Sequence, residues 1–390
     1  MAHIYFHEGD YTVSGPGGKA ALLSKEFALL YFLYRNQGKT FTREHLLDQV
    51  WPLEYPGERT VDDHIYRLRK KLSFIPEIKI HTVRGLGYRL TAAQHSLNAL
   101  NPSMADSELQ SAVYSLFQKY HLFGQGKSIT TLIAQQEALG IKVAPFYENY
   151  LHFLGGDLSW FMSRDDLKAE DRLYWLLILY GVIASPQEGL QLCQKALLHS
   201  RLEPAYHREM YYLNIIDLYA ENGMYSEAEE RIAASYRLLD EQDDLESFRI
   251  PLMLSELLLY IHEADCARVE NSIQEISRSL KHKPYLREIC RFHYMQGMWH
   301  YRQGRIREAS AAVDDALEIY SQSGFVPHIL LSVRQFLYYM ELHPPVQADK
   351  AVTGLTSKLL SIFQDLDNQH HYTSRKEACF YLIQSLLSSV

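Results

Sequence analysis

The 390-residue sequence predicts a mainly α-helical protein, in which a small α+β winged helix-turn-helix precedes an all-α stack of helices. Three observations predict this fold class. Residues 59–73 combine an apolar stripe of helical period with cations on the opposite face. Residues 78–90 predict two short strands around a glycine-containing turn. Beyond residue 107 the apolar periodicity is helical almost throughout.

The first fifty residues predict short strands followed by two helices. Residues 3–23 alternate in hydropathy around the run GPGG, so they predict a small antiparallel sheet. Ser24 is the candidate N-cap of a first helix, which the run NQG at 36–38 ends. Thr42 is the candidate N-cap of a second helix, which Pro52 closes.

The third helix, residues 60–73, begins with the capping-box spacing of Thr60 and Asp63. Its apolar stripe comprises Val61, Ile65, Leu68 and Leu72. The residues that point away from the stripe are Arg59, Asp63, Tyr66, Arg67 and Lys70. One face is thus predicted to anchor the helix, while the other presents cations to a DNA groove.

The net charge of −8 is unevenly distributed along the chain. Residues 1–93 hold 13 Lys and Arg against 10 Asp and Glu, a balance of +3, whereas the remainder holds 26 against 37, a balance of −11. The basic balance accompanies the helix and the hairpin, as expected for a nucleic-acid-binding surface. We expect the acidic part to point away from DNA.

Cysteine usage and hydropathy predict a cytoplasmic protein without a membrane anchor. The four cysteines have no CxxC spacing, and we expect reduced, buried thiols at Cys193, Cys266, Cys290 and Cys379. No signal peptide is evident at the start of the sequence. The longest apolar run, residues 173–184, is shorter than the roughly twenty residues of a spanning helix, so it predicts a buried helix.

Fragments that resemble enzyme motifs are incomplete. His262-Glu263 lacks the second histidine of a HExxH zinc site, and the run GLG at 85–87 lacks the helix that follows a dinucleotide fingerprint. His370 and His371 are adjacent and would point about 100° apart on a helix. The sequence therefore predicts no enzymatic activity, no cofactor and no metal site.

From about residue 23 to residue 90 the sequence resembles the DNA-binding domain of OmpR/PhoB-type transcriptional regulators. Four motifs carry the resemblance in the family's order and spacing: LSKEFALLYFL, TREHLLDQVW, RTVDDHIYRLRKKL and HTVRGLGYRL. The resemblance implies that the third helix enters the major groove of double-stranded DNA, and that the wing, residues 78–90, reaches the minor groove or its phosphates. The candidate DNA-binding residues are Arg59, Thr60, Asp63, His64, Tyr66, Arg67, Arg69, Lys70, Thr82 and Arg84.

Two of these positions depart from the family's pattern. Asp63 stands where an apolar residue is common. It would accept a hydrogen bond from cytosine N4, or else cap the helix with Thr60 or pair with Arg67. Tyr66 stands where an arginine is common, and it would stack or bond to a phosphate, or be exposed without a partner. The family's sequence preference is therefore not carried over.

The loop of residues 51–58 joins the second and third helices. In the family this loop often contacts RNA polymerase, which makes Glu54 and Glu58 candidate polymerase contacts; a plain connector is the alternative. Family members usually carry an N-terminal receiver domain, whereas this sequence begins at the winged-helix sheet, so we expect control to act through the C-terminal three quarters. The resemblance also implies tandem protomers on DNA, and hence a homodimer at least there.

Residues 93–107 are small, polar and interrupted by proline, as in a linker between domains at residues 1–92 and 108–390. Within the second domain, residues 211–235 and 293–317 resemble tetratricopeptide (TPR) repeats, with Gly223 aligned to Gly304 and Ala228 to Ala309. Further helices are expected at residues 170–203, 245–282, 326–364 and 372–388. The aromatic residues of this TPR-like domain are expected to form core, or alternatively to line a groove for a peptide or small molecule.

The order of the two domains resembles HilA-type virulence regulators and SARP-type activators. These resemblances predict a cytoplasmic bacterial transcriptional regulator, an activator by analogy, that binds promoter direct repeats. A ligand or a protein bound to the helical domain would control it. The alternatives are a protein-interaction adaptor, and an anti-activator that pairs with a homologous regulator.

Overall fold

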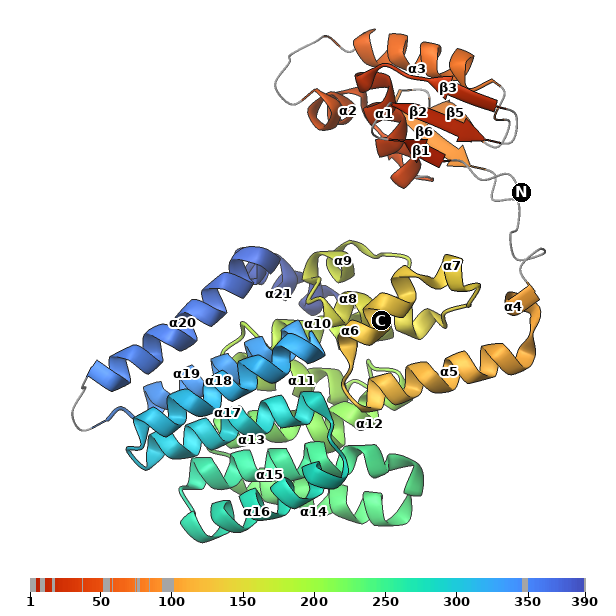
Figure 1. Ribbon diagram of the computed structural model, residues 1–390. Helices are drawn as coiled ribbons and strands as arrows, with labels where there is room; N and C mark the ends of the chain where they lie inside the picture. Colours follow the sequence, from red (N-terminus) through yellow and green to blue (C-terminus); the bar gives the residue numbers. More distant parts are fainter. Residues whose placement is uncertain are drawn as a thin grey trace. The chain divides into compact units, whose positions relative to one another are not determined.

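The computed structural model describes the chain apart from residues 1–4, 8–10, 16–17, 37, 52–56, 58, 74, 76–77, 84, 93–101, 346–349 and 389–390. The chain divides into two compact units, Met1–Ala105 and Asp106–Val390. Figure 1 shows the elements of each unit.

The first unit combines antiparallel sheets with helices, which confirms the predicted winged helix-turn-helix. One sheet has the strand order β1-β2-β3, and the other has the order β4-β6-β5. The elements are β1 (Tyr5–His7), β2 (Thr12–Gly15), β3 (Gly18–Ala21), α1 (Ser24–Arg35), β4 (Thr40–Phe41), α2 (Arg43–Val50), α3 (Arg59–Lys71), β5 (Ile78–Val83), β6 (Gly87–Ala92) and α4 (Pro102–Ala105).

The predicted N-cap residue is confirmed for α2 and is wrong for α1. The Thr42 hydroxyl accepts a hydrogen bond from the His45 amide at 3.1 Å, so the predicted N-cap of α2 is confirmed. The prediction for α1 is wrong by one residue, because Ser24 already lies in the helix and Leu23 is the N-cap. The Glu26 carboxylate accepts from the Leu23 amide at 2.9 Å, which satisfies that donor without a serine hydroxyl.

A strand that the sequence did not predict, β4, pairs with β6 beside the wing. Thr40 pairs with Arg89 and Phe41 with Tyr88, an element too short to show a hydropathy period. Gly87 makes this close approach possible. A Cβ there would lie 2.0 Å from the Phe41 carbonyl oxygen, and its φ of +148° is one that L side chains rarely adopt.

The second unit is built from helices, most of which pack in antiparallel pairs (Figure 1). Its elements are α5 (Ser107–Leu122), α6 (Gly126–Ala134), α7 (Gln136–Leu139), α8 (Pro145–Leu154), α9 (Leu158–Ser163), α10 (Ala169–Tyr180), α11 (Pro186–Leu198), α12 (Pro204–Glu209), η2 (Met210–Asn214), α13 (Ile215–Glu221), α14 (Tyr225–Glu241), η3 (Asp243–Phe248), α15 (Arg249–Glu263), α16 (Cys266–His282), α17 (Leu286–Arg302), α18 (Ile306–Ser323), α19 (Val326–Leu342), α20 (Lys350–His370) and α21 (Tyr372–Ser388). The all-helical prediction for this region is therefore confirmed.

The two segments aligned as repeats form helical pairs with matching turns. Gly223 between α13 and α14 has φ +70°, and Gly304 between α17 and α18 has φ +73°, so both turns need the left-handed conformation that glycine tolerates. Ala228 and Ala309, five residues after these glycines, are fully buried in their pairs. That the pairs are TPR repeats stays a prediction.

The first helix of residues 211–235 differs from the regular helix that the sequence predicted. A π-helical turn, η2, lies between α12 and α13. Such a turn inserts an extra residue per turn, and sequence periodicity over so few residues does not reveal it.

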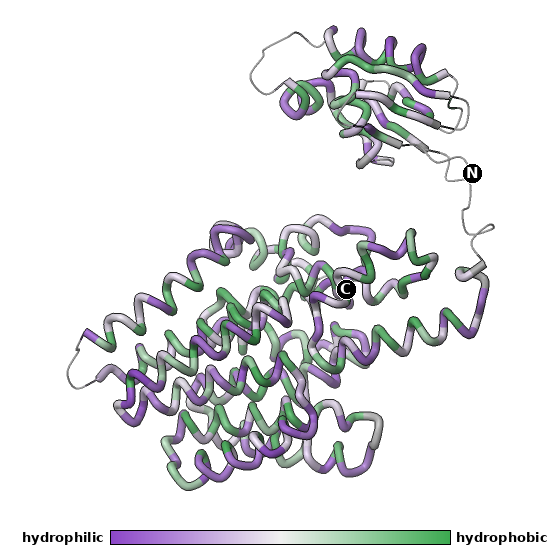
Figure 2. Tube along the Cα trace, viewed as in Figure 1, coloured by the Kyte–Doolittle hydropathy of each residue, from purple (hydrophilic) through white to green (hydrophobic). Residues whose placement is uncertain are grey.

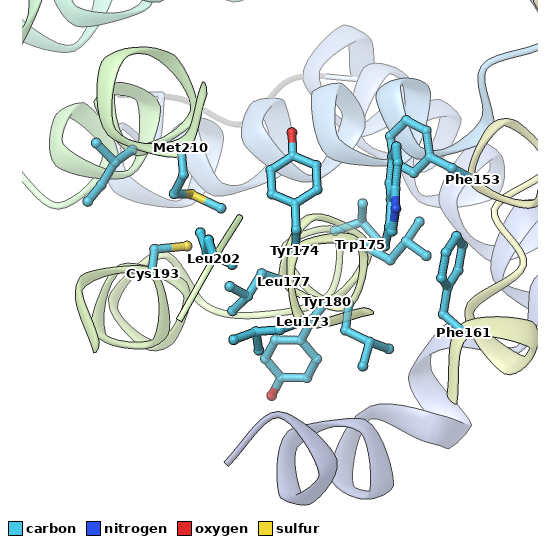
Figure 3. Close-up of a cluster of buried hydrophobic side chains, with 14 of the residues drawn as sticks. Phe153, Phe161, Leu173, Tyr174, Trp175, Leu177, Tyr180, Cys193, Leu202 and Met210 are labelled. Atoms are coloured by element: carbon cyan, nitrogen blue, oxygen red, sulfur yellow. The ribbon is translucent and has the colours of Figure 1, made fainter. Parts of the chain in front are cut away.

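Helix α10 belongs to the core of the second unit, which confirms a buried helix for residues 173–180 of the longest apolar run; residues 181–184 follow it as a turn and not as helix. Its side chains from Arg172 to Leu177 are all buried. Figure 3 shows Tyr174, Trp175 and Tyr180 projecting to different sides of the helix. Within the described residues, no helix combines the length and the hydropathy needed to cross a bilayer.

The cysteines are free thiols, as the sequence predicted. Cys193, Cys290 and Cys379 are buried. The expectation of burial is wrong for Cys266, which is exposed because it occupies the first position of α16, next to the N-cap Asp265.

Candidate nucleic-acid interface

The candidate interface is built on α3, whose 13 residues span about 20 Å. The predicted apolar stripe is confirmed, because Val61, Ile65 and Leu68 are fully buried and Leu72 is 4% exposed. In Figure 2 the hydrophilic residues of α3 lie on the side of the helix that faces away from the strands. The helix is therefore held along one face and offers the other to solvent.

The solvent face of α3 carries the residues that the sequence placed there. Arg59, Asp63, Tyr66, Arg67 and Lys70 are all exposed, and 69% of Tyr66 is accessible. In the described part of the chain, none of the three cations among them forms an ion pair. Their guanidinium and ammonium groups are thus available to phosphate oxygens or to acceptors on guanine.

Two further candidates, Arg69 and Thr82, contact each other. The Arg69 guanidinium donates to the Ile80 carbonyl oxygen from Nε at 2.9 Å and from Nη2 at 2.6 Å. Its Nη2 also donates to the Thr82 hydroxyl at 2.9 Å. These bonds join α3 to β5, so Arg69 and Thr82 hold the wing against the helix.

His64 and Thr60 lie at the start of the helix and are half-buried. Nδ1 of His64 donates to the Thr60 carbonyl oxygen at 2.7 Å, because a carbonyl oxygen can only accept. The imidazole also packs edge-on against Trp51, with 5.0 Å between ring centroids. The predicted capping box is wrong, since α3 begins at Arg59 and Thr60 already lies inside its first turn.

The acidic residue that organises the site is Asp62 rather than Asp63. Oδ1 of Asp62 accepts a hydrogen bond from the Tyr88 hydroxyl at 2.6 Å and another from Arg43 Nε at 2.7 Å. Within the described residues, Asp63 has neither a hydrogen bond nor an ion pair, so the predicted pairing with Arg67 does not form. Asp62 thereby joins α2, α3 and the base of the wing.

These partners shift the protonation equilibrium of Asp62. Burial raises the pKa of its carboxyl, but the hydrogen bonds from Tyr88 and Arg43 outweigh burial and bring the pKa below its ordinary value. The Arg43 guanidinium also lies over the Tyr88 ring, 5.0 Å from its centroid. Sequence reasoning missed all three residues. The one available signal was helical phase, because Asp62 lies only 100° from the stripe residue Val61.

A buried ion pair fixes the opposite end of α3. Lys71 Nζ lies 2.6 Å from Glu26 Oε2, and the Glu26 side chain is 1% exposed. Burial raises the pKa of Glu26, but its hydrogen bonds with the Leu23 amide and Lys71 outweigh this effect, and the net shift is downward. Helix α3 is thus anchored to α1 as well as to the wing.

Three predicted site residues lie outside the described residues: Arg84, Glu54 and Glu58. Beside Arg84, the turn of the wing contains Gly85, with φ +76°, and Leu86, which is 52% exposed. The Leu86 amide donates to the Val83 carbonyl oxygen at 3.0 Å and closes the hairpin. The described part of the wing therefore ends in a tight, solvent-facing turn.

Comparison with known proteins gives matches to this first unit. Residues 17–90 match the family model described as "Transcriptional regulatory protein, C terminal". The chain is 46% identical over 83 residues to the sensory transduction protein RegX3 of Mycobacterium leprae, which covers 20% of this chain and 42% of that protein. It is 42% identical over 93 residues to the transcriptional regulatory protein ResD of Bacillus subtilis, which covers 23% of this chain and 39% of that protein.

Solved structures of response-regulator domains match the same region. The DNA-binding domain of Bacillus subtilis CssR is 37% identical, with 23% of this chain and all of that chain covered and a TM-score of 0.21. The C-terminal domain of the nisin resistance regulator NsrR is 27% identical, with 23% and 92% covered and a TM-score of 0.21. The chain spans less than half the length of the two curated relatives above. Residues 17–90 therefore form a domain of the OmpR/PhoB type, in the family of transcriptional regulatory protein C-terminal domains.

Proposed function

We propose that this protein is a cytoplasmic bacterial transcriptional regulator, an activator, that binds double-stranded DNA through α3 and the wing. The observation that carries the proposal is the solvent face of α3, where Arg59, Arg67 and Lys70 are exposed without ion-pair partners in the described part of the chain. A helix with one buried face and one cationic face suits the major groove, which is about 12 Å wide. The family match at residues 17–90 supports the same reading.

The roles of the individual side chains follow from their positions. Arg67 lies in the middle of the exposed face, where its planar fork suits the O6 and N7 acceptors of guanine. Lys70, one turn nearer the C-terminus, suits a phosphate, which fixes position but does not read sequence. Tyr66, which precedes Arg67 and lies one turn before Lys70, offers a ring or a hydroxyl, and Asp63 offers a carboxylate to cytosine N4.

The proposal has three further parts. The protein binds direct repeats as tandem protomers, the loop of residues 51–58 contacts RNA polymerase, and the helical second unit controls the activity. The first two rest on the resemblance to the family. The third rests on the second unit, which contains no element of the winged helix and has a cavity of about 780 Å³.

The test is chromatin immunoprecipitation of the full-length protein beside the double variant Arg67→Ala, Lys70→Ala. We expect discrete peaks that share a repeated motif and disappear in the variant. The matched control is Lys39→Ala, which removes a cation at the base of the hairpin, where the neighbouring Gly38 amide donates to Leu90. Peaks that persist in the double variant would contradict the assignment of the α3 face.

Binding in vitro separates the two cations. In fluorescence anisotropy with a DNA fragment taken from a peak, Arg67→Ala is expected to lose about 1–3 kcal/mol and to relax preference at one base pair. Lys70→Ala is expected to weaken binding to all sequences alike. It is also expected to reduce by about one the slope of log affinity against log salt concentration. Full-length protein that binds no DNA at low salt would instead favour the adaptor or anti-activator alternative.

A further inference from the structure

The helical second unit contains a partly open cavity of about 780 Å³. It is lined by residues of α5, α8, α10, α13, α15, α17 and α19, so segments far apart in the sequence form one wall. The volume falls within the roughly 300–1,000 Å³ of small-molecule sites. The family match ends at residue 90, and the two curated relatives above match only 20% and 23% of this chain.

One wall of the cavity carries charged side chains from three helices. On α13, Asp217 accepts hydrogen bonds from Arg291 of α17 and, at 3.2 Å, from Gln335 of α19. One turn further along α13, Glu221 accepts two hydrogen bonds from Arg334 of α19, at 2.9 and 3.0 Å. The two acids therefore lie one helical turn apart on α13, and each is paired with an arginine in this wall; Asp217 also contacts the amide of Gln335.

A third ion pair lies beside Arg291 on α17. Arg287, one turn before Arg291 on α17, donates to Oε1 of Glu288 from Nε at 2.9 Å and from Nη2 at 2.7 Å. Burial lowers the pKa of Arg287, but its acidic neighbours, Glu288 foremost, outweigh burial and keep the guanidinium charged. Both residues line the cavity, and the Glu288 side chain is 4% exposed.

Each of these ion pairs leaves hydrogen-bonding capacity unused. Oδ1 of Asp217 and Oε2 of Glu288 are buried acceptors without a hydrogen-bond partner among the described residues. Nε of Arg291 and both Nε and Nη1 of Arg334 are buried donors without one. Buried charged atoms without partners are costly. The four residues that carry these atoms also line the cavity, so this wall suits a bound molecule with both a cationic and an anionic group.

The cavity also offers an apolar and aromatic side. His121 stacks on Tyr150 with 4.3 Å between ring centroids, and Phe146 stacks on His121 at 5.7 Å. Burial lowers the pKa of His121 to about 3, so this imidazole is an uncharged ring at neutral pH. Tyr150 is buried, and its hydroxyl has no hydrogen-bond partner within the described residues. Trp175 of α10 lies near this group, with 6.4 Å between its ring centroid and that of Tyr150.

The π-helical turn η2 is a further local sign of a binding site. Its residues Met210, Leu213 and Asn214 line the cavity directly before Asp217. Turns of this kind occur frequently at functional sites, because they re-aim side chains of an otherwise regular helix. Here the turn precedes the two acids of α13 that face Arg291 and Arg334.

We propose that this cavity binds a small zwitterion with an aromatic or apolar body, the chemistry of an aromatic amino acid or a short peptide with free termini. Its ammonium group lies against Asp217 and Glu288, its carboxylate lies against Arg291 and Arg334, and its body lies among the rings near Tyr150. An effect of this ligand on transcription rests on the proposed function, whereas its binding does not. The competing explanation is a polar network that only holds the helices together.

The test is isothermal titration calorimetry of the full chain without DNA. The probes are L-phenylalanine, L-tryptophan, Phe-Phe and Leu-Phe, each beside its N-acetylated and its C-amidated form. We expect saturable binding by at least one free zwitterion, and at least a tenfold loss of affinity when either end is capped. No saturable binding up to about 1 mM by any probe, or equal affinity of capped and free forms, would overturn the proposal.

Variants separate ligand contact from a structural role. Tyr150→Phe removes an unpartnered hydroxyl, so we expect it to keep or raise the Tm of the free protein while it weakens probe binding severalfold. Glu288→Gln tests the ammonium contact, and Arg237→Gln on the exposed surface of α14 is the matched control. Unchanged probe affinity in both cavity variants would assign the network to structure alone. DNA binding measured separately by anisotropy stays intact in either outcome, so the two proposals fail independently.

Discussion

The Tyr88 hydroxyl donates a hydrogen bond to Oδ1 of Asp62 over 2.6 Å, and this contact joins the base of the wing to α3. Arg43 donates to the same oxygen, so the amino end of α2 meets the other two elements at one atom. The relative position of helix and wing is therefore held by Asp62, Tyr88 and Arg43, which are not among the residues proposed to contact DNA.

The adjacent acids Asp62 and Asp63 give a matched pair of substitutions. Asp62→Asn is expected to destabilise the fragment of residues 1–105 by about 1 kcal/mol, because the charge that receives two hydrogen bonds is lost from a side chain that is partly exposed. Asp63→Asn is expected to leave stability unchanged. Urea unfolding followed by the fluorescence of Trp51, the only tryptophan in this fragment, measures both. Equal stability of the two variants would contradict the role given to Asp62.

Glu26 predicts an acid-sensitive step in the unfolding of the first unit. Its folded-state pKa is lowered, so its contribution to the free energy of unfolding is present above the ordinary value of 4.5 and is lost as pH falls through the folded pKa. Glu26→Gln is expected to lower stability at pH 7 and to flatten the dependence on pH below about 4.5. The same urea titration of residues 1–105, repeated from pH 7 to pH 3, measures this slope. Glu44→Gln, at an exposed position of α2, is the control, and an unaltered slope in Glu26→Gln would refute the prediction.

Arg69 and Arg67 are two positions apart, but their substitution by alanine is expected to have different effects on stability and on DNA affinity. Arg69→Ala removes the bonds to Ile80 and Thr82, so it is expected to lower both stability, by about 1–2 kcal/mol, and DNA affinity. Arg67→Ala is expected to lower affinity alone. Arg69→Lys is expected to restore little of the lost stability, because an ammonium group cannot reproduce the forked hydrogen bonds of the planar guanidinium group. Urea unfolding and anisotropy on the same preparations test this, and a stable Arg69→Ala protein with reduced affinity would make Arg69 a direct DNA contact instead.

The two glycines of the wing predict unequal costs for the same substitution. Gly85→Ala meets no atom within 4 Å, so only the left-handed φ is unfavourable, at about 1–2 kcal/mol. Gly87→Ala places a Cβ 2.0 Å from the Phe41 carbonyl oxygen and must displace β4, so we expect a loss of at least about 3 kcal/mol. Urea midpoints of the two variants of residues 1–105 provide the comparison. Similar midpoints would mean that β4 is not held against β6.

Local pattern was sufficient for those features that depend on neighbours in the sequence. The apolar stripe of α3, the Thr42 cap, the hairpin and the helical pairs around Gly223 and Gly304 each follow from spacing within a few turns. The strand β4 could not be found in this way, because two residues pair with β6 only once the wing is folded. The π-helical turn before Asp217 is equally invisible, since it shifts the phase of one turn only.

The sequence by itself determined that a cationic helix and a glycine-containing hairpin follow each other, because helical and strand periods fix which side chains share a face. Only the tertiary structure decided that Asp62 and not Asp63 joins the elements, and that Arg69 holds the wing. It also decided that Asp217 meets Gln335, 118 positions away, in a cavity wall. Such contacts depend on how whole helices pack, and the free energy of packing depends on surfaces that no local pattern contains.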